Sequence, residues 1–263
     1  MTDPNLGFRV SVSHVGIASH SSSSIAWLEN GRGITYGEFV SDVERMAASR
    51  LRSVVVSESD NSYECLVGIL AAWIASGSIC LLAQGWPNTW KSQIQKLTAG
   101  LSATDLLREE AFYVLPTSGS TGTPKLVPIS RSNWTVFMAG LMREYSWGVG
   151  TRVALTFQPS FDPFIAVAIL ALIHGATLVP LGRKSHFNVF DFCYENRIDV
   201  WASTPSLARL NLIRSSGRCC ESLQESLFTG ERLTSGLVRQ WQNHAPNSRL
   251  ENLYGPVETT VWL

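Results

Sequence analysis

Short apolar or β-branched runs alternate with helical patterns along the second half of the chain, and this alternation constrains its fold most. The predicted strands are residues 152–157, 176–181, 198–203, 226–230 and 249–255, and the predicted helices between them are residues 163–175, 188–197, 205–217 and 233–244. A strand, a crossover helix and a second strand form a parallel pair. The strand runs do not alternate between apolar and polar residues, which is typical of strands covered by helices on both faces. The sequence therefore predicts an α/β fold, doubly wound, with mainly parallel sheets flanked by helices.

The first part of the chain repeats this order of elements. Its predicted elements, in chain order, are residues 34–51 (helix), 53–59 (strand), 62–78 (helix) and 79–83 (strand). Thr35 and Glu38 stand three residues apart at the start of the first helix, as in a capping box. We therefore predict two α/β subdomains, residues 1–111, which are abbreviated, and residues 112–263.

Composition favours a small-molecule partner over a nucleic acid or a membrane. The chain is 45% hydrophobic, and its 21 basic and 21 acidic residues leave no net charge. No block of like charge could follow a nucleic-acid backbone or an anionic membrane. The sequence has no basic leader followed by an apolar stretch and no apolar run of about 18 residues, so we expect a soluble, cytoplasmic protein. The five cysteines show no C-x-x-C spacing, which predicts core thiols rather than a disulfide framework or a zinc site.

A loop rich in hydroxyl groups follows the predicted buried strand at residues 112–115. Residues 117–125, TSGSTGTPK, combine five hydroxyls, two glycines and one lysine. Backbone N–H groups, hydroxyls and an ammonium together suit a polyanion such as a triphosphate. The order differs from G-x-x-x-x-G-K-[ST], which argues against a Walker-type NTPase. An ordinary Ser/Gly turn is the less favoured reading, because such turns are shorter.

This loop resembles the phosphate-binding loop of the adenylate-forming superfamily, which includes acyl-CoA synthetases, luciferases and the adenylation domains of nonribosomal peptide synthetases. Further stretches resemble family elements in the expected order, namely ITYGEF, SFDPFIAVAILALIHGATLVP, STPSLARLN, LFTGERL and NLYGPVETTVW. The resemblance covers roughly residues 21 to 263 and is strongest to the N-terminal core of a peptide synthetase adenylation domain.

The resemblance implies ATP-dependent activation of a carboxylate as an acyl adenylate, with release of pyrophosphate and with ATP and Mg²⁺ as cofactors. It implies that the β- and γ-phosphates are held by Thr117, Ser118, Gly119, Ser120, Thr121, Gly122 and Lys125. Glu258 would bind Mg²⁺, and Lys125 and Glu258 would be the catalytic residues. The adenine and α-phosphate would lie along Asn252, Tyr254 and Gly255, with Tyr254 stacking on the base. A carrier protein could then accept the acyl group on a thiol.

Asp162 indicates which class of carboxylate substrate the resemblance implies. In amino-acid-activating members the aspartate at this place pairs with the substrate ammonium, which would also keep a buried carboxylate charged. The alternative is that Asp162 only caps a helix that starts at Pro163. The family's substrate pocket would comprise Asp162, Pro163, Ala166, Ser203, Leu227, Thr229, Leu253, Val261 and Trp262. A tryptophan on the pocket floor predicts a small amino acid.

Some features depart from the family pattern. Leu126 follows the loop lysine where the family has glycine, and Val257 replaces a threonine. Residues 87–112 look abbreviated, which predicts a missing strand and helix. The chain printed here ends at Leu263, ahead of the family's Y-x-T-G-D element and C-terminal lid domain, so we expect a truncated or split core that works with a separate C-terminal domain. The alternative is a non-catalytic descendant that binds a nucleotide or a partner protein.

Overall fold

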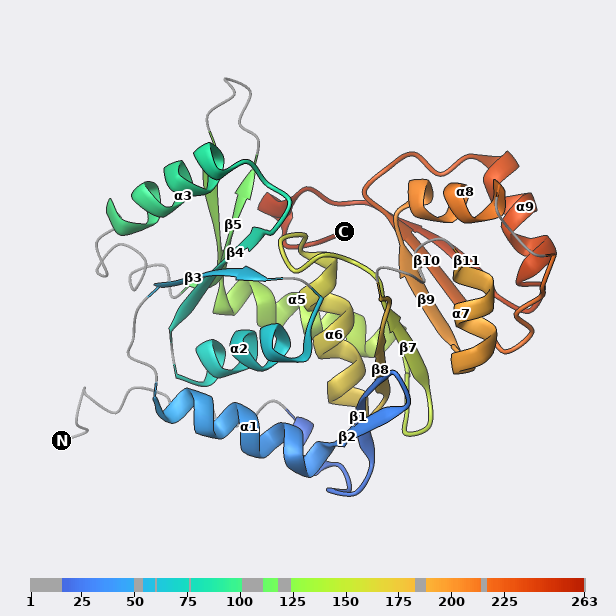
Figure 1. The fold of residues 1–263 in the computed structure, drawn as a ribbon, viewed down its shortest axis with the longest axis horizontal. Helices are drawn as coiled ribbons and strands as arrows, with labels where there is room; N and C mark the ends of the chain where they lie inside the picture. Colours follow the sequence, from blue (N-terminus) through green and yellow to red (C-terminus); the bar gives the residue numbers. More distant parts are fainter. Residues whose placement is uncertain are drawn as a thin grey trace.

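The structure is a computed structural model, and it contains two β-sheets with helices packed on and between them (Figure 1). It describes residues 16–49, 54–59, 61–75, 77–100, 111–117, 124–182, 188–213 and 217–262. The predicted α/β fold with mainly parallel sheets flanked by helices is confirmed.

The larger sheet has seven strands in the order β11-β10-β9-β7-β8-β1-β2. In that order the strands are Arg249–Leu253, Glu225–Thr229, Val200–Ser203, Arg152–Leu155, Thr177–Pro180, Ile25–Glu29 and Arg32–Thr35. All neighbours from β11 to β1 are parallel, and β1 and β2 form an antiparallel hairpin. Parallel strands end at the same edge, so the carboxyl ends of β9, β10 and β11 lie side by side.

The smaller sheet has four strands in the order β3-β4-β5-β6. These strands are Val54–Ser59, Ser78–Ala83, Ala111–Thr117 and Lys125–Ser130. The first three are parallel, whereas β6 runs antiparallel to β5. The hydroxyl-rich loop therefore joins the two strands of a hairpin.

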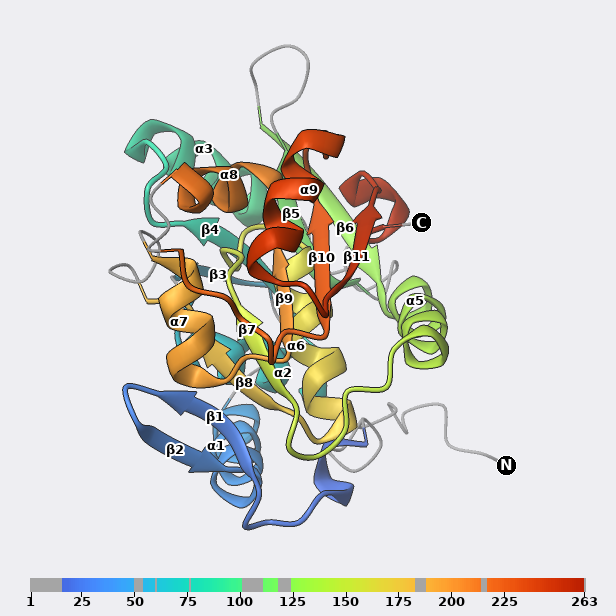
Figure 2. The ribbon, with the colours of Figure 1, turned by 90° about the vertical axis from the view of Figure 1, so that its right-hand side faces the viewer.

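Helices form an inner layer and two outer layers (Figures 1 and 2). The helices α2 (Tyr63–Ile74), α5 (Arg131–Glu144) and α6 (Pro163–His174) pack in one core with the inner faces of both sheets. The outer face of the large sheet is covered by α7 (Val189–Asn196), α8 (Pro205–Ile213) and α9 (Ser235–His244), and α3 (Asn88–Gly100) covers the small sheet. Helix α6 is buried on every side from Pro163 to Leu172, which explains its unbroken apolar sequence.

The N-terminal helix α1 (Tyr36–Ala48) begins with the predicted capping box. The Thr35 side chain accepts a hydrogen bond from the backbone N–H of Glu38 at 3.2 Å, and the Glu38 carboxylate accepts one from the N–H of Thr35 at 2.8 Å. This reciprocal pair satisfies donors that every helix start leaves free.

Several elements were not predicted from the sequence: the hairpin β1–β2, strand β6, helix α5, and helix α3 in the stretch expected to be abbreviated. The hairpin had a recognisable marker in Asn30-Gly31, whose φ angles of 51° and 78° suit a type I′ turn. The sheets also cross the proposed boundary between residues 111 and 112, because β1 and β2 join the larger sheet while β5 and β6 join the smaller one. The two-subdomain division stays a prediction.

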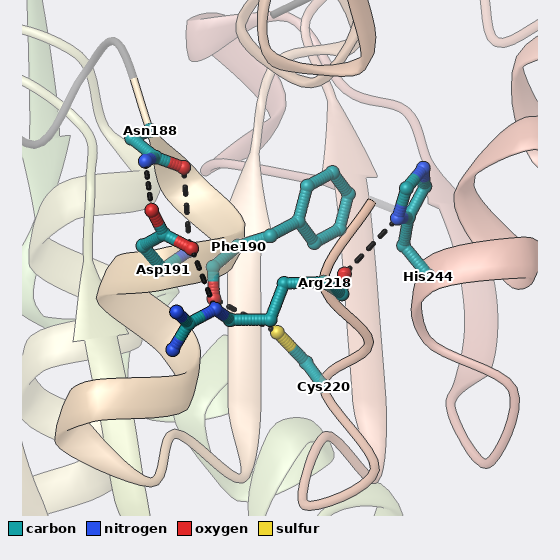
Figure 3. Close-up of polar contacts among 6 residues, drawn as sticks. All are labelled: Asn188, Phe190, Asp191, Arg218, Cys220 and His244. Atoms are coloured by element: carbon teal, nitrogen blue, oxygen red, sulfur yellow. Dashed lines mark hydrogen bonds and ion pairs between the residues drawn. The ribbon is translucent and has the colours of Figure 1, made fainter. Parts of the chain in front are cut away.

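An ion pair and hydrogen bonds hold the segment before β10 against α7 and α9 (Figure 3). Arg218 Nε lies 3.0 Å from Asp191 Oδ1, and the Cys220 thiol donates to the carbonyl oxygen of Phe190 at 3.1 Å. The ring nitrogen Nδ1 of His244 lies 3.1 Å from the carbonyl oxygen of Arg218. These contacts explain why a short irregular segment holds a defined position beside the sheet.

The free thiols are mainly core residues, as predicted. Cys65, Cys80, Cys193 and Cys220 are buried, and Cys219 is exposed. Within the described ranges, no helix is both long and apolar enough to span a membrane.

Candidate functional site

Two segments far apart in the sequence meet between the sheets. Strand β6 contacts η4 (Val257–Thr259), a short 3-10 helix near the end of the chain. The Trp262 ring packs against Phe137 of α5, with centroids 5.7 Å apart, and the end of the described chain lies between the two sheets in Figure 1. The flanks of the hydroxyl-rich loop and the NLYGPVETTVW stretch thus form one region.

Asp162 is a buried carboxylate at the start of α6, directly before Pro163. Its side chain makes no capping hydrogen bond, so the capping alternative is not what the structure has. Only 2% of the residue is exposed, and Oδ2 has no hydrogen-bond partner among the described residues. Burial raises the pKa of Asp162 to about 7; the backbone N–H groups of Asp162 and Val261 lower it, and the charge of Glu258 raises it.

The backbone around Val261 is held in an uncommon conformation. Thr260 and Val261 have φ angles of 67° and 70°, in the left-handed region that β-branched residues rarely adopt. Such outliers persist where surrounding contacts enforce them, and here the segment presents the Val261 N–H to Asp162.

Gly255 packs directly against this segment. A Cβ atom at position 255 would lie 2.6 Å from the Val261 carbonyl oxygen and closer still to the Cα of Trp262. Both neighbouring atoms belong to the backbone and cannot move away as a flexible side chain can. Only glycine, which has no Cβ, therefore allows residue 255 to pack this closely on residues 261–262.

Most of the predicted substrate residues lie in the same core. Ala166, Leu227, Leu253, Val261 and Trp262 belong to or pack against the core that α2, α5 and α6 form with the inner faces of both sheets. Pro163 and Thr229 are also buried, and Thr229 pairs with Leu253 where β10 and β11 end.

Ser203 is placed differently from the other predicted pocket residues. Its hydroxyl accepts a hydrogen bond from the Trp201 indole at 2.9 Å and donates to the carbonyl of Thr204 at 3.1 Å. Trp201 belongs to the core beneath α7, α8 and α9. The Ser203 hydroxyl is therefore hydrogen-bonded on the face of the larger sheet that these helices cover.

The predicted nucleotide-binding residues are exposed or partly exposed where they are described. Thr117 ends β5 and pairs with Lys125, the exposed first residue of β6, while Ser118, Gly119, Ser120, Thr121 and Gly122 lie outside the described residues. Asn252 is exposed, and Tyr254 is 74% exposed, which leaves its ring free to stack.

Glu258 is an exposed carboxylate in η4. In the part of the chain that the structure describes, no three His, Cys, Asp or Glu side chains converge as a metal site. A single carboxylate nevertheless suits Mg²⁺, which proteins bind through one or two carboxylates together with substrate phosphates.

Tyr113 on β5 and Trp134 on α5 are buried polar aromatic residues that the sequence analysis did not assign to the site. Both are fully buried, yet Tyr113 Oη and Trp134 Nε1 have no hydrogen-bond partner among the described residues. The charge of Asp162 adds to burial in raising the pKa of Tyr113 well above its usual value. A polar aromatic residue inside an otherwise apolar strand, as in FYVL, could have drawn attention to Tyr113.

A broad groove of about 760 Å³ lies elsewhere, between the β1–β2 hairpin, α1 and α2. Its charged residues have both signs, and among them Asp42 accepts from Tyr63 Oη at 2.8 Å and forms an ion pair with Arg45. None of the buried side-chain atoms that lack a partner among the described residues belongs to this groove, whereas Asp162 Oδ2 is one of them.

Comparison with known protein families finds one model that matches residues 78–263, the AMP-binding enzyme family. A curated relative, the D-alanine--D-alanyl carrier protein ligase of Listeria monocytogenes serotype 4b, is 35% identical over 158 residues. That alignment covers 58% of this chain and 31% of the relative, so the chain spans about a third of the length of that ligase.

Solved structures share the fold. The Vibrio cholerae adenylation domain AlmE, in complex with glycyl-adenosine-5'-phosphate, superposes with a TM-score of 0.81 at 19% identity over 100% of this chain and 62% of AlmE. The AMPPNP-bound form of the nonribosomal peptide synthetase FmoA3 gives a TM-score of 0.80 at 18% identity, over 97% of this chain and 32% of that protein. At these identities the likeness concerns the fold.

Proposed function

This chain belongs to the AMP-binding enzyme family, and from that premise we propose that it activates the carboxylate of a small amino acid with ATP. A carboxylate oxygen of the amino acid attacks the α-phosphate of ATP, the bond to the β-phosphate breaks, and an aminoacyl adenylate and pyrophosphate result. The observation that carries this proposal is the buried Asp162, whose Oδ2 has no partner among the described residues.

An amino acid suits Asp162 better than a simple carboxylic acid does. A carboxylate with a pKa raised to about 7 by burial becomes fully charged when a cation pairs with it. The α-ammonium of an amino acid supplies that cation and a donor for Oδ2. A fatty or aryl acid would leave the buried carboxylate unpaired, which is costly.

The surroundings favour a small side chain. Trp262, Leu227 and Leu253 share the inner core with Val261, whose backbone N–H lowers the pKa of Asp162. Large side chains at these positions leave little room for a bulky substrate. The names of two similar proteins, a D-alanine ligase and a glycyl-adenylate complex, concern amino acids of this size.

We place ATP along the edge formed by the hydroxyl-rich loop and the NLYGP stretch. Thr117 to Gly122 and Lys125 would hold the triphosphate, and Tyr254, with Asn252 and Gly255 beside it, would stack on the adenine. Glu258 would hold Mg²⁺, which neutralises charge on the phosphates. A carrier protein or a separate C-terminal domain would act with this core, since the similar Listeria enzyme is a D-alanine--D-alanyl carrier protein ligase.

Amino-acid-dependent exchange of pyrophosphate into ATP tests the proposal. Glycine and both enantiomers of alanine should support exchange, whereas phenylalanine and propionate should not. ATP binding without exchange for any amino acid would favour the non-catalytic alternative, and failure to bind ATP would contradict the proposal.

A paired substitution in the loop tests the nucleotide site. Lys125→Ala with Thr121→Ala should weaken ATP binding about tenfold or more, because a charge-assisted hydrogen bond is lost. The melting temperature should stay nearly constant, since Lys125 is exposed. ATP titration of this variant should be compared with Lys96→Ala, which removes an exposed lysine from α3. Equal ATP affinity in all three proteins would refute the assignment.

A further inference from the structure

A row of aromatic contacts leads from Tyr113 on β5 to Trp262 near the end of the described chain. Tyr113 packs edge to face on Trp134 with centroids 5.7 Å apart, and Trp134 contacts Phe137 at 5.6 Å. Phe137 contacts Trp262 at 5.7 Å, and the neighbouring Val261 gives its N–H to Asp162. The charge of Asp162 also acts on Tyr113 and adds to burial in raising the pKa of its hydroxyl.

Two buried polar atoms on this row, Tyr113 Oη and Trp134 Nε1, have no partner among the described residues, and neither has Asp162 Oδ2. In folded proteins nearly all buried polar groups are hydrogen-bonded, so each orphan requires an explanation. Asn61 Oδ1 and His174 Nδ1 also lack a partner among the described residues but do not belong to this row. Tyr113 and Asp162 are linked by the charge that acts between them, which indicates that a polar group could complete both.

The donor and acceptor capacity of each of these polar groups limits what it can bind. Trp134 Nε1 can only donate a hydrogen bond, whereas the Tyr113 hydroxyl can both donate and accept. The raised pKa of Tyr113 keeps that hydroxyl neutral at physiological pH. An ammonium group carries three donors and no acceptor, so of the two aromatic groups only Tyr113 can accept from it.

We propose that Tyr113 is a specificity-determining residue whose hydroxyl accepts a second hydrogen bond from the ammonium that pairs with Asp162. This inference rests on the proposed function and adds a named residue to it. A carboxylate oxygen and a phenol oxygen then satisfy two of the three ammonium donors in a dry environment. The pair selects α-amino acids against carboxylic acids of the same shape, because only an amine satisfies both atoms.

The decisive variant is Tyr113→Phe, which removes only the hydroxyl. The affinity for alanine should fall about tenfold, the effect of losing a hydrogen bond to a charged group, while the weak binding of propionate stays unchanged. The melting temperature without ligand should stay constant or rise, because Tyr113 Oη loses no protein partner among the described residues. If Tyr113 had a purely structural role, its replacement would not lower alanine affinity selectively while leaving the melting temperature constant or higher.

A matched control makes the outcome interpretable. Tyr36 is equally buried, and its hydroxyl donates to the Ala176 carbonyl at 2.7 Å, so Tyr36→Phe should lower the melting temperature and leave alanine binding unchanged.

The possible outcomes distinguish failure of the Tyr113 inference from failure of the proposed function. Unchanged alanine affinity in Tyr113→Phe overturns the role of Tyr113 while leaving the proposed function in place, and so does an equal loss for alanine and propionate. A wild-type protein that binds alanine no better than propionate overturns the proposed function and this inference together.

Discussion

Replacing Asp162 with asparagine is expected to lower amino-acid-dependent pyrophosphate exchange by about a hundredfold, equivalent to about 3 kcal/mol. The substitution keeps the shape of the side chain and removes the charge that would pair with the substrate ammonium in a buried site. ATP affinity should change little, because the nucleotide contacts proposed here are made by other residues. Exchange assays over a range of alanine concentrations, together with ATP titration, provide the measurement.

The same variant carries a stability test whose sign follows from the pKa. Burial raises the pKa of Asp162 from 3.8 to about 7, which disfavours the charged form in the folded protein and corresponds to about 4 kcal/mol at pH 8. For an acid shifted in this direction, stability is fully present below the ordinary pKa and is lost as the pH rises through 7. Without ligand, Asp162→Asn should therefore melt higher than wild type at pH 8, and the difference should shrink toward pH 4.

Asp42→Asn serves as the control for both measurements. Asp42 accepts a hydrogen bond from Tyr63 and pairs with Arg45, so its loss should not raise stability at pH 8 and should not affect exchange. Full exchange activity in Asp162→Asn would contradict the role of this carboxylate. Equal melting temperatures of Asp162→Asn and wild type at every pH would contradict its burial in a charged form.

Replacing Gly255 with alanine is expected to destabilise the protein by about 3 kcal/mol and to abolish measurable exchange. The added Cβ would meet the Val261 carbonyl at 2.6 Å, and backbone atoms on both sides must shift to make room. That shift would displace the Val261 N–H from Asp162 and Trp262 from Phe137. Urea denaturation and the exchange assay measure the two effects.

Gly236→Ala offers a matched control for this substitution. Gly236 lies in α9 (Ser235–His244), and a Cβ there would meet no atom within 4 Å. Alanine is the better helix former, so stability should stay equal or increase slightly. A Gly255→Ala protein as stable as Gly236→Ala would show that residues 261–262 do not pack on Gly255.

Local features of the sequence were sufficient for much of the fold. The capping box at Thr35, the buried helix from Pro163 and the alternating strands and helices all depend on residues close together in the chain. Pairing between distant strands was harder to predict. The β1–β2 hairpin carries its Asn30-Gly31 turn in the sequence, but nothing local says that it joins β8 at the edge of the larger sheet.

The family and the residue types of the candidate site were thus determined by the sequence alone, since the loop TSGSTGTPK and the stretch NLYGPVETTVW are recognisable as ordered motifs. Only the tertiary structure decided the state of Asp162. From the sequence, a role as a helix cap alone remained an alternative. Its missing side-chain cap, its raised pKa and an Oδ2 without a partner among the described residues follow from burial by segments more than 90 residues distant, such as Val261. The same holds for Tyr113 and Trp134, whose orphan polar atoms arise because β5, α5, α6 and the end of the chain converge. Desolvation and hydrogen-bond satisfaction depend on which atoms surround a group in space, and packing between distant segments sets them.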